Sequence, residues 1–480
     1  MPVHARKVVT AAAAIGIAGD WLLRGGRWRL GFALWLLALI IAVLTIGGRG
    51  PRERTLLLAG IAFASCGLVL RDSLMLYRID LLSVLCVGAL LIRHGTGATI
   101  ARLHTVNVPR VGLLALLNTI GGASRVPGGG IGTTTTSAPR SQTVRSLLLG
   151  AALAVPPITI VSALLASSDP LFNNLLQRIF DVDLFAHLCV ALLLTWIATG
   201  WLRASLGDAI GASIPELRSP ALPFMTVSVA LYALVAVLAA FLVTQARVLF
   251  GGEAFLTSTE YLSLADYARR GFFELILAAG IVLTTLVVAE WLLPADATAA
   301  YMHYRRVAIV LLAMVAAVLV SATTRIALYV TRFGLSVDRL LAIAMIVWVL
   351  AALVMFAWGV LQRQTEEFFP RVLVATVIWV ASFNAINPEA LVTHINMSRA
   401  AAGAPFDIAY HASLSADAIP SLVRAAPRLG AGVCRQLRYA LIVAHIKERA
   451  DNGPHDWRST SLPATRIDAW YDRGAPINCP

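Results

Sequence analysis

Apolar runs long enough to cross a bilayer recur along most of the chain, and this feature limits its possible folds more than any other. A spanning helix needs about 20 mostly apolar residues, because lipid offers its backbone no hydrogen-bond partners. Runs of this kind, each bounded by charged residues, predict about eleven spanning helices, at 8–23, 30–46, 55–70, 74–92, 144–167, 184–202, 221–245, 271–293, 304–323, 338–361 and 370–386. Only 14% of the 480 residues are charged, whereas soluble domains have about a quarter. The composition therefore excludes an ordinary soluble enzyme and predicts an all-α, polytopic helical membrane protein.

The distribution of arginine predicts the orientation of these helices, because cytoplasmic loops carry an excess of Lys and Arg. The loop from Arg93 to Arg145 holds six arginines and no acidic residue, whereas residues 168–183 hold three aspartates and one arginine. We therefore expect the first loop and the N-terminus in the cytoplasm. An odd number of spans then places the C-terminal part on the opposite side of the membrane. The net charge of +13 fits cytoplasmic loops and lipid headgroups, so the lipid bilayer is an expected partner and nucleic acid is not.

Changes in composition divide the chain into four segments. Residues 1–120 hold four predicted helices, 121–142 form a flexible linker rich in Gly, Thr and Ser, 143–386 form a seven-helix core, and 387–480 form a small helical domain. In this last segment, called the tail below, Asn387 as N-cap and Pro388 at the first helical position predict a helix that ends near residue 400. Further helices are expected within 414–426 and from 429 to 449. Cys434 and Cys479 can pair only if the tail faces an oxidising compartment.

Ionisable side chains in apolar runs are the first candidates for function, because lipid makes them costly. Glu274 lies near the start of one predicted span, and Arg325 lies at the end of another. They either form a pair, which lines a polar path or locks two helices, or reach the membrane interface separately. The sequence contains no metal-ligand spacing such as HExxH and no nucleotide-binding or nucleophile motif. We therefore expect no metal and no cofactor, and we favour a non-enzymatic protein.

Six short segments of mixed polarity stand out between and after the apolar runs. They are LADYARRGFFE at 264–274, RFGLSVDR at 332–339, NPEALV at 387–392, DIAY at 407–410, LSADAIP at 414–420 and DWR at 456–458. With this set, the chain resembles a bacterial family of membrane proteins designated domain of unknown function number four-one-seven-three, which is related to number four-one-five-three. The resemblance implies an inner-membrane protein with a C-terminal helical domain, and it brings no known activity or catalytic residue.

The six segments lie in the tail and at predicted helix ends on the side expected outside. Their charged and aromatic residues, together with Glu274 and Arg325, are the candidate site residues, and most are expected to form one polar network: Asp266, Arg269, Arg270, Arg332, Asp338, Arg339, Asp407, Tyr410 and Asp417. The network either fixes the tail by salt bridges or forms a site for a ligand or partner.

Three classes of function are consistent with these features. We favour an envelope sensor, regulator or assembly partner that acts through the outer face, with another envelope protein as a candidate partner. The first alternative is a secondary transporter or channel-like permease with a polar path near Glu274 and Arg325. A membrane enzyme is the third class, and it requires convergent acidic or histidine side chains in an outer pocket.

Overall fold

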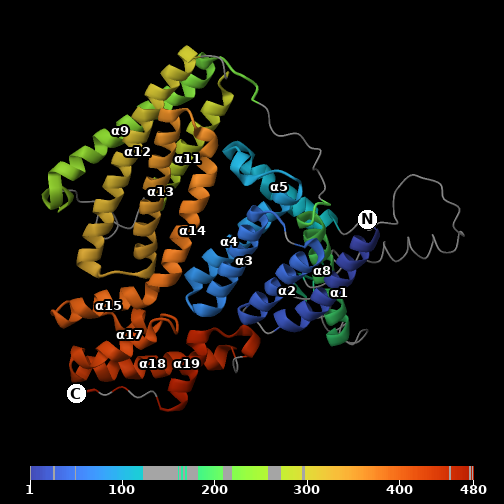
Figure 1. The fold of residues 1–480 in the computed structure, drawn as a ribbon. Coiled ribbons are helices and arrows are strands. Elements are labelled where there is room, and N and C mark those ends of the chain that lie inside the picture. The colour runs from blue at the N-terminus through green and yellow to red at the C-terminus, as the bar shows by residue number, and fades with distance from the viewer. Residues whose placement is uncertain are drawn as a thin grey trace, which may run out of the picture. The chain divides into compact units, whose positions relative to one another are not determined.

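Figure 1 shows the computed structural model of the chain. It describes residues 2–24, 28–48, 50–122, 182–208, 219–257, 272–294, 298–452 and 456–474, together with the positions 161, 164–165, 168–169, 477 and 479–480. The described residues form helices and no strand. The prediction of an all-α fold is therefore confirmed for the part of the chain that the structure describes.

The chain divides into two compact units. The first comprises Met1–Ile100, Pro109–Pro215 and Glu448–Asp468, and the second comprises Ala101–Val108, Glu216–Lys447 and Ala469–Pro480. The tail thus contributes residues to both units. The segment boundaries at 120, 142 and 386 stay predictions, and the linker expected at 121–142 lies outside the described residues beyond Gly122.

The first unit contains α1 (Pro2–Leu23), α2 (Leu30–Gly47), α3 (Arg52–Leu70), α4 (Leu74–Gly95), α5 (Val108–Gly121) and α8 (Val182–Ser205). α1 packs closely against α8, because Gly16 leaves room for the neighbouring backbone. A Cβ atom at this position would lie only 2.0 Å from Thr195 Oγ1 and 2.6 Å from the Thr195 backbone nitrogen. Small residues allow such close approach of helices in membranes, where van der Waals packing replaces the hydrophobic effect. Helix α5 lies in the segment that the sequence predicted as a loop.

The second unit contains α9 (Phe224–Thr257), α11 (Phe272–Leu292), α12 (Thr298–Phe333), α13 (Val337–Gln362) and α14 (Phe368–Ile386). α12 packs against α9, α11 and α13 and contributes much of the buried apolar core. Its largest fully buried side chain is Tyr304, whose hydroxyl donates a hydrogen bond of 2.9 Å to the Leu286 carbonyl on α11. The bond satisfies the one polar atom of this buried ring.

The tail contains α15 (Pro388–Ala401), α16 (Ile408–Ala412), α17 (Ile419–Ala425), α18 (Ala431–Asn452) and α19 (Leu462–Asp472) (Figure 1). Asn387 caps α15 by accepting a hydrogen bond of 3.1 Å from the Ala390 N–H, and Pro388 follows at the first helical position. The predicted start of the first tail helix is therefore confirmed. The expected third helix is confirmed as α18, whereas the short helix α16 was not predicted.

Among the described residues, nine helices are long and apolar enough to cross a membrane. They are Leu30–Gly47, Arg52–Leu70, Leu74–Gly95, Ala186–Ser205, Phe224–Thr244, Glu274–Leu292, Thr298–Phe333, Val337–Gln362 and Thr365–Ile386. Each corresponds to one of the eleven predicted spans. The first predicted span is helical as α1 but is not among the nine, and the span expected at 144–167 falls almost entirely outside the described residues. The chain therefore has a polytopic, membrane-like helical fold.

Candidate functional site

Side chains of the tail hold residues 334–336, the turn between α12 and α13. The Leu335 N–H donates to Asn396 Oδ1 on α15 at 2.9 Å, and Asn396 Nδ2 donates to the Leu335 carbonyl at 2.6 Å. Leu335 is 6% exposed and Asn396 is 9% exposed. Gly334 lies at φ +80°, and a Cβ there would meet Asn396 Oδ1 at 2.9 Å, so glycine suits both the backbone and the contact. Because buried backbone groups need partners, the tail completes the structure of this turn.

Two further tail residues bind the helix ends beside the turn. Arg399 on α15 donates from Nη1 to the Val330 carbonyl at 2.5 Å and from Nη2 to the Thr331 carbonyl at 2.7 Å. These carbonyls lie in the last turn of α12, where a positive charge also complements the helix dipole. At the other helix, the Val337 N–H donates to the Tyr410 hydroxyl at 2.9 Å. We call Asn396, Arg399, Tyr410 and His411, together with the turn they hold, the turn clamp.

His411 lies in the centre of the turn clamp and is 2% exposed. Its Nδ1 lies 2.7 Å from the Asp407 carbonyl, and its Nε2 lies 3.3 Å from Asn396 Nδ2. The Phe406 ring stacks on the imidazole at a centroid distance of 4.4 Å, and the Tyr410 ring meets it edge-on at 5.1 Å. Burial lowers the pKa of His411, although the Asp407 carbonyl and carboxylate oppose this change. Burial also raises the pKa of Tyr410.

Hydrogen bonds within the tail fix the start of α15. Glu389 Oε2 accepts from the Ser415 N–H at 2.7 Å and from the Ser415 hydroxyl at 2.6 Å. Asn387 Nδ2 donates to the Asp417 carbonyl at 3.3 Å. These contacts tie α15 to residues 415–417 and so make the turn clamp part of one folded unit.

The sequence identified part of this region. Arg339 lies over the Tyr329 ring at 4.1 Å and donates to the Gly334 carbonyl, and Asp407 caps α16 by accepting from the Tyr410 N–H at 2.9 Å. Arg332 and Asp338 are exposed close to the turn, whereas Asp417 is buried in the tail. Asp266, Arg269 and Arg270 lie outside the described residues.

Glu274 and Arg325 lie on different helices of the second unit. Glu274 is exposed on the first turn of α11, and Arg325 is 8% exposed near the end of α12. In the part of the chain that the structure describes, the two side chains do not form an ion pair with each other. The hypothesis of a shared polar path between them therefore gains no geometric support.

Asn396, Arg399, His411 and Glu389 were not among the predicted site residues, although Glu389 lies in the segment NPEALV at 387–392. Asn396 and Arg399 are three residues apart on α15, so they share one helix face. That spacing was a usable signal for a polar contact. Asn396 is a neutral amide whose main partners are backbone atoms, so neither charge nor a motif marks it in the sequence.

The first unit contains a second contact of the tail, which we call the loop clamp: Trp457, Arg458 and Ser461 against Trp21 and Asp72. The Trp21 and Trp457 rings lie 5.4 Å apart, and Arg458 donates to the Trp21 carbonyl. Ser461 Oγ donates to Asp72 Oδ1 at 2.8 Å. The DWR segment at 456–458 thus binds the end of α1, and the next residues bind the start of α4.

A polar cluster joins α1 to α8 beside the loop clamp. Asp20 Oδ2 lies 2.5 Å from His187 Nδ1, and Arg24 Nη2 lies 3.2 Å from Asp20 Oδ1. Arg24 also donates to His187 Nε2. Within the described residues, no group of three or more His, Cys, Asp or Glu side chains is placed to hold a metal ion.

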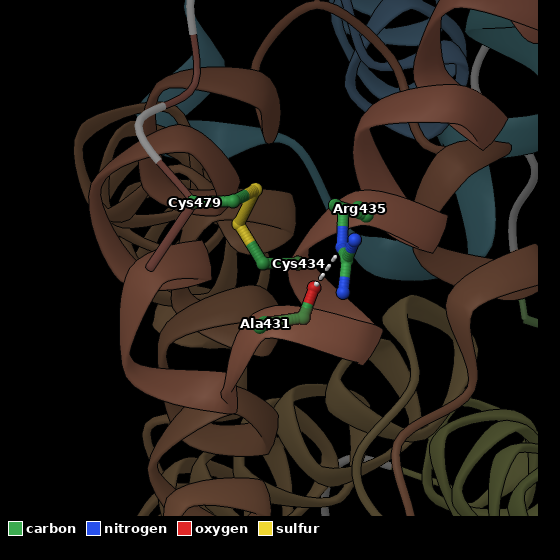
Figure 2. The surroundings of a disulfide bond; sticks show 4 residues. All are labelled: Ala431, Cys434, Arg435 and Cys479. Carbon is green, nitrogen blue, oxygen red and sulfur yellow. Dashed lines mark hydrogen bonds between the residues drawn. A yellow bond between two sulfur atoms is a disulfide. The ribbon is translucent and has the colours of Figure 1, made fainter.

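Cys434 and Cys479 form a disulfide, with their Cα atoms 5.6 Å apart (Figure 2). Figure 2 also shows Arg435 donating to the Ala431 carbonyl within α18. The bond attaches the C-terminal end of the chain to α18, and Cys434 is fully buried. The pairing that the sequence left open is therefore present. Cys66, Cys86 and Cys189 are free.

Residues 57–425 match the family described as Domain of unknown function (DUF4153). The match covers more than half of the chain and includes all of the turn clamp. It corresponds to the related family named in the resemblance, and family number four-one-seven-three is not shown. No curated protein and no solved structure matches the chain.

Proposed function

The chain belongs to the DUF4153 family, and we propose that it is a bacterial inner-membrane protein that acts as an envelope sensor, regulator or assembly partner. In this proposal the tail lies outside the membrane and receives the signal or the partner. The turn clamp passes the change to the spanning helices α12 and α13.

The double hydrogen bond between Asn396 and Leu335 carries the proposal. It pairs both backbone groups of a buried residue that lies between two spanning helices. A displacement of α15 leaves these groups without partners, at a cost of about 1–3 kcal/mol for each group. In this proposal the turn has a docked and a released arrangement, and a molecule that binds the tail better in one of them shifts the balance between them.

The disulfide supports the location of the tail. Disulfides form and persist in oxidising compartments such as the bacterial periplasm and are rare in the cytosol. An outside tail with the Cys434–Cys479 pair agrees with the arginine-rich loop at 93–145, which favours a cytoplasmic position for that loop and for the N-terminus.

Cysteine labelling in intact cells tests the location. The three free cysteines are replaced and the disulfide is kept, because it attaches the C-terminus to α18. Single cysteines then replace Ala450 in the tail and Ala101 in the arginine-rich loop, both of which are exposed. A membrane-impermeant maleimide should label position 450 and not position 101. The reverse pattern would place the tail in the cytoplasm and refute the proposed outer face.

Complementation tests the role. A deletion strain is grown under envelope stress with variants present at equal membrane levels. We expect rescue by the wild type and by Glu274→Gln, and loss of rescue with Asn396→Ala. A transporter with a polar path at Glu274 predicts the opposite ranking, with Glu274→Gln inactive.

A further inference from the structure

The hydrogen bonds around His411 determine where its proton lies. Asn396 Oδ1 accepts from the Leu335 N–H, so Asn396 Nδ2 is the donor that faces both the Leu335 carbonyl and His411 Nε2. His411 Nε2 must therefore accept a hydrogen bond. Nδ1 must carry the hydrogen that is donated to the Asp407 carbonyl. The clamp accommodates the neutral imidazole in one tautomer.

Among the described residues, the partner of His411 Nε2 is the Asn396 amide nitrogen, which is a donor, so a second proton on His411 finds no acceptor there. It would place an N–H at Nε2 opposite the Asn396 amide hydrogens, 3.3 Å away between the heavy atoms. Rotating the Asn396 amide by 180° would relieve that contact but would set an NH₂ group against the Leu335 N–H and an oxygen against its carbonyl. Neither orientation of Asn396 satisfies both the turn and a charged imidazole.

The surrounding groups do not replace the lost acceptor. Asp407 at the start of α16 acts on His411 directly, and the charged residues near the adjoining Tyr410 ring are Glu389 on α15 and Asp338 and Arg339 at the start of α13. Arg399 on α15 binds carbonyls at the end of α12. Asp407 favours protonation, and burial outweighs it. Phe406 and Tyr410 cover the ring and limit its access to water.

We infer that the turn clamp is a proton-sensitive contact: protonation of His411 releases the turn at 334–336 from α15. The signal for the proposed sensor is then acidification on the side of the membrane where the tail lies. In this respect the inference rests on the proposed function. The release itself depends only on residues within the second unit.

Proton linkage gives the direction and size of the effect. The pKa of a solvent-exposed histidine is about 6.5, and burial in the turn clamp lowers the pKa of His411 below that value. Well above pH 6.5 the imidazole is neutral in both the docked and the released arrangement, so pH does not change the balance between them. As the pH falls below about 6.5, the released arrangement binds the extra proton and gains population, up to about tenfold at pH 5.5 relative to pH 7.5.

Hydrogen exchange of the full chain in lipid nanodiscs tests the inference. The readout is the protection factor of the Leu335 and Val337 amides, which donate hydrogen bonds within the turn clamp. At each pH the measured exchange rate is corrected for the intrinsic exchange rate. In the wild type, protection should fall by up to about tenfold between pH 7.5 and pH 5.5. The matched control is His394→Gln, because His394 is an exposed histidine on α15, the helix that carries Asn396; this variant should behave as the wild type.

Two variants make the result specific. His411→Gln keeps an acceptor near the Nε2 position and does not titrate, so its protection should not depend on pH. Asn396→Asp keeps an acceptor for the Leu335 N–H and sets its other carboxylate oxygen against both the Leu335 carbonyl and His411. Its protection should therefore be lower than that of the wild type at pH 7.5, and it should rise as the pH falls and His411 becomes charged. The inference is overturned if wild-type protection is constant, if His411→Gln keeps the wild-type pH dependence, or if Asn396→Asp loses protection in acid. Because exchange is measured on purified protein, its failure is distinguishable from a wrong location of the tail in cells.

Discussion

Removal of the Arg399 guanidinium should release the tail from the end of α12. Its two hydrogen bonds to the Val330 and Thr331 carbonyls are 2.5 and 2.7 Å long. A hydrogen bond from a charged group contributes about 1.5–3 kcal/mol when buried. Arg399 is half-buried, and solvent screening reduces this value. We expect Arg399→Ala to destabilise the docked tail by about 2 kcal/mol, which corresponds to about thirtyfold more of the released form.

Native-state proteolysis with thermolysin measures this population in the full chain in nanodiscs. When the tail redocks faster than it is cleaved, the cleavage rate is proportional to the released fraction. Lysine in Arg399→Lys keeps the positive charge but reaches only one carbonyl at a time. We therefore expect the cleavage rate to rise about fivefold over that of the wild type. The control is Arg424→Ala, because Arg424 is exposed and its Nε donates to the Pro420 carbonyl of its own helix. Equal cleavage rates for Arg399→Ala and Arg424→Ala would refute the reasoning.

Three further predictions concern the disulfide, the α1–α8 contact and the loop clamp. Alkylation of the denatured, unreduced protein should add three groups to the wild type and four to Cys434→Ser, since three of the five cysteines are free; five groups on the wild type would contradict the pairing. Gly16→Ala should increase amide exchange in α1, at a cost of about 1–3 kcal/mol, because its Cβ would overlap Thr195. Gly112→Ala, whose Cβ meets open space, should have no such effect, and equal exchange in both variants would show that α1 does not pack as described. Ser461→Ala removes the hydrogen bond to Asp72, which contributes about 1 kcal/mol. Thermolysin cleavage of residues 456–461 should therefore be about fivefold faster, and an unchanged rate would exclude a stabilising loop clamp.

Local sequence patterns predicted the spanning helices because hydropathy and charge act residue by residue. Each of the nine candidate spans coincides with an apolar run bounded by charged residues. The start of α15 was equally predictable, since Asn387 and Pro388 act on the backbone directly beside them. Helix α5 was missed because its 14 residues are too few for a span and lie within an arginine-rich loop.

The candidate site shows the limit of such patterns. The sequence identified Arg339, Asp407 and Tyr410 as members of a polar region, because charged and aromatic residues are conspicuous near helix ends. The central contact joins Asn396 to Leu335, which are 61 positions apart. A neutral amide that pairs with backbone atoms leaves no mark in composition or charge.

The sequence by itself determined an all-α chain with helices long and apolar enough to cross a membrane and a helical tail, because apolar length and helix caps are local properties. Only the tertiary structure decided that His411 is buried between Asp407 and Asn396, and that Cys434 pairs with Cys479. These outcomes depend on which helix faces meet, and each contact forms only when the packing brings distant residues within hydrogen-bond or covalent reach.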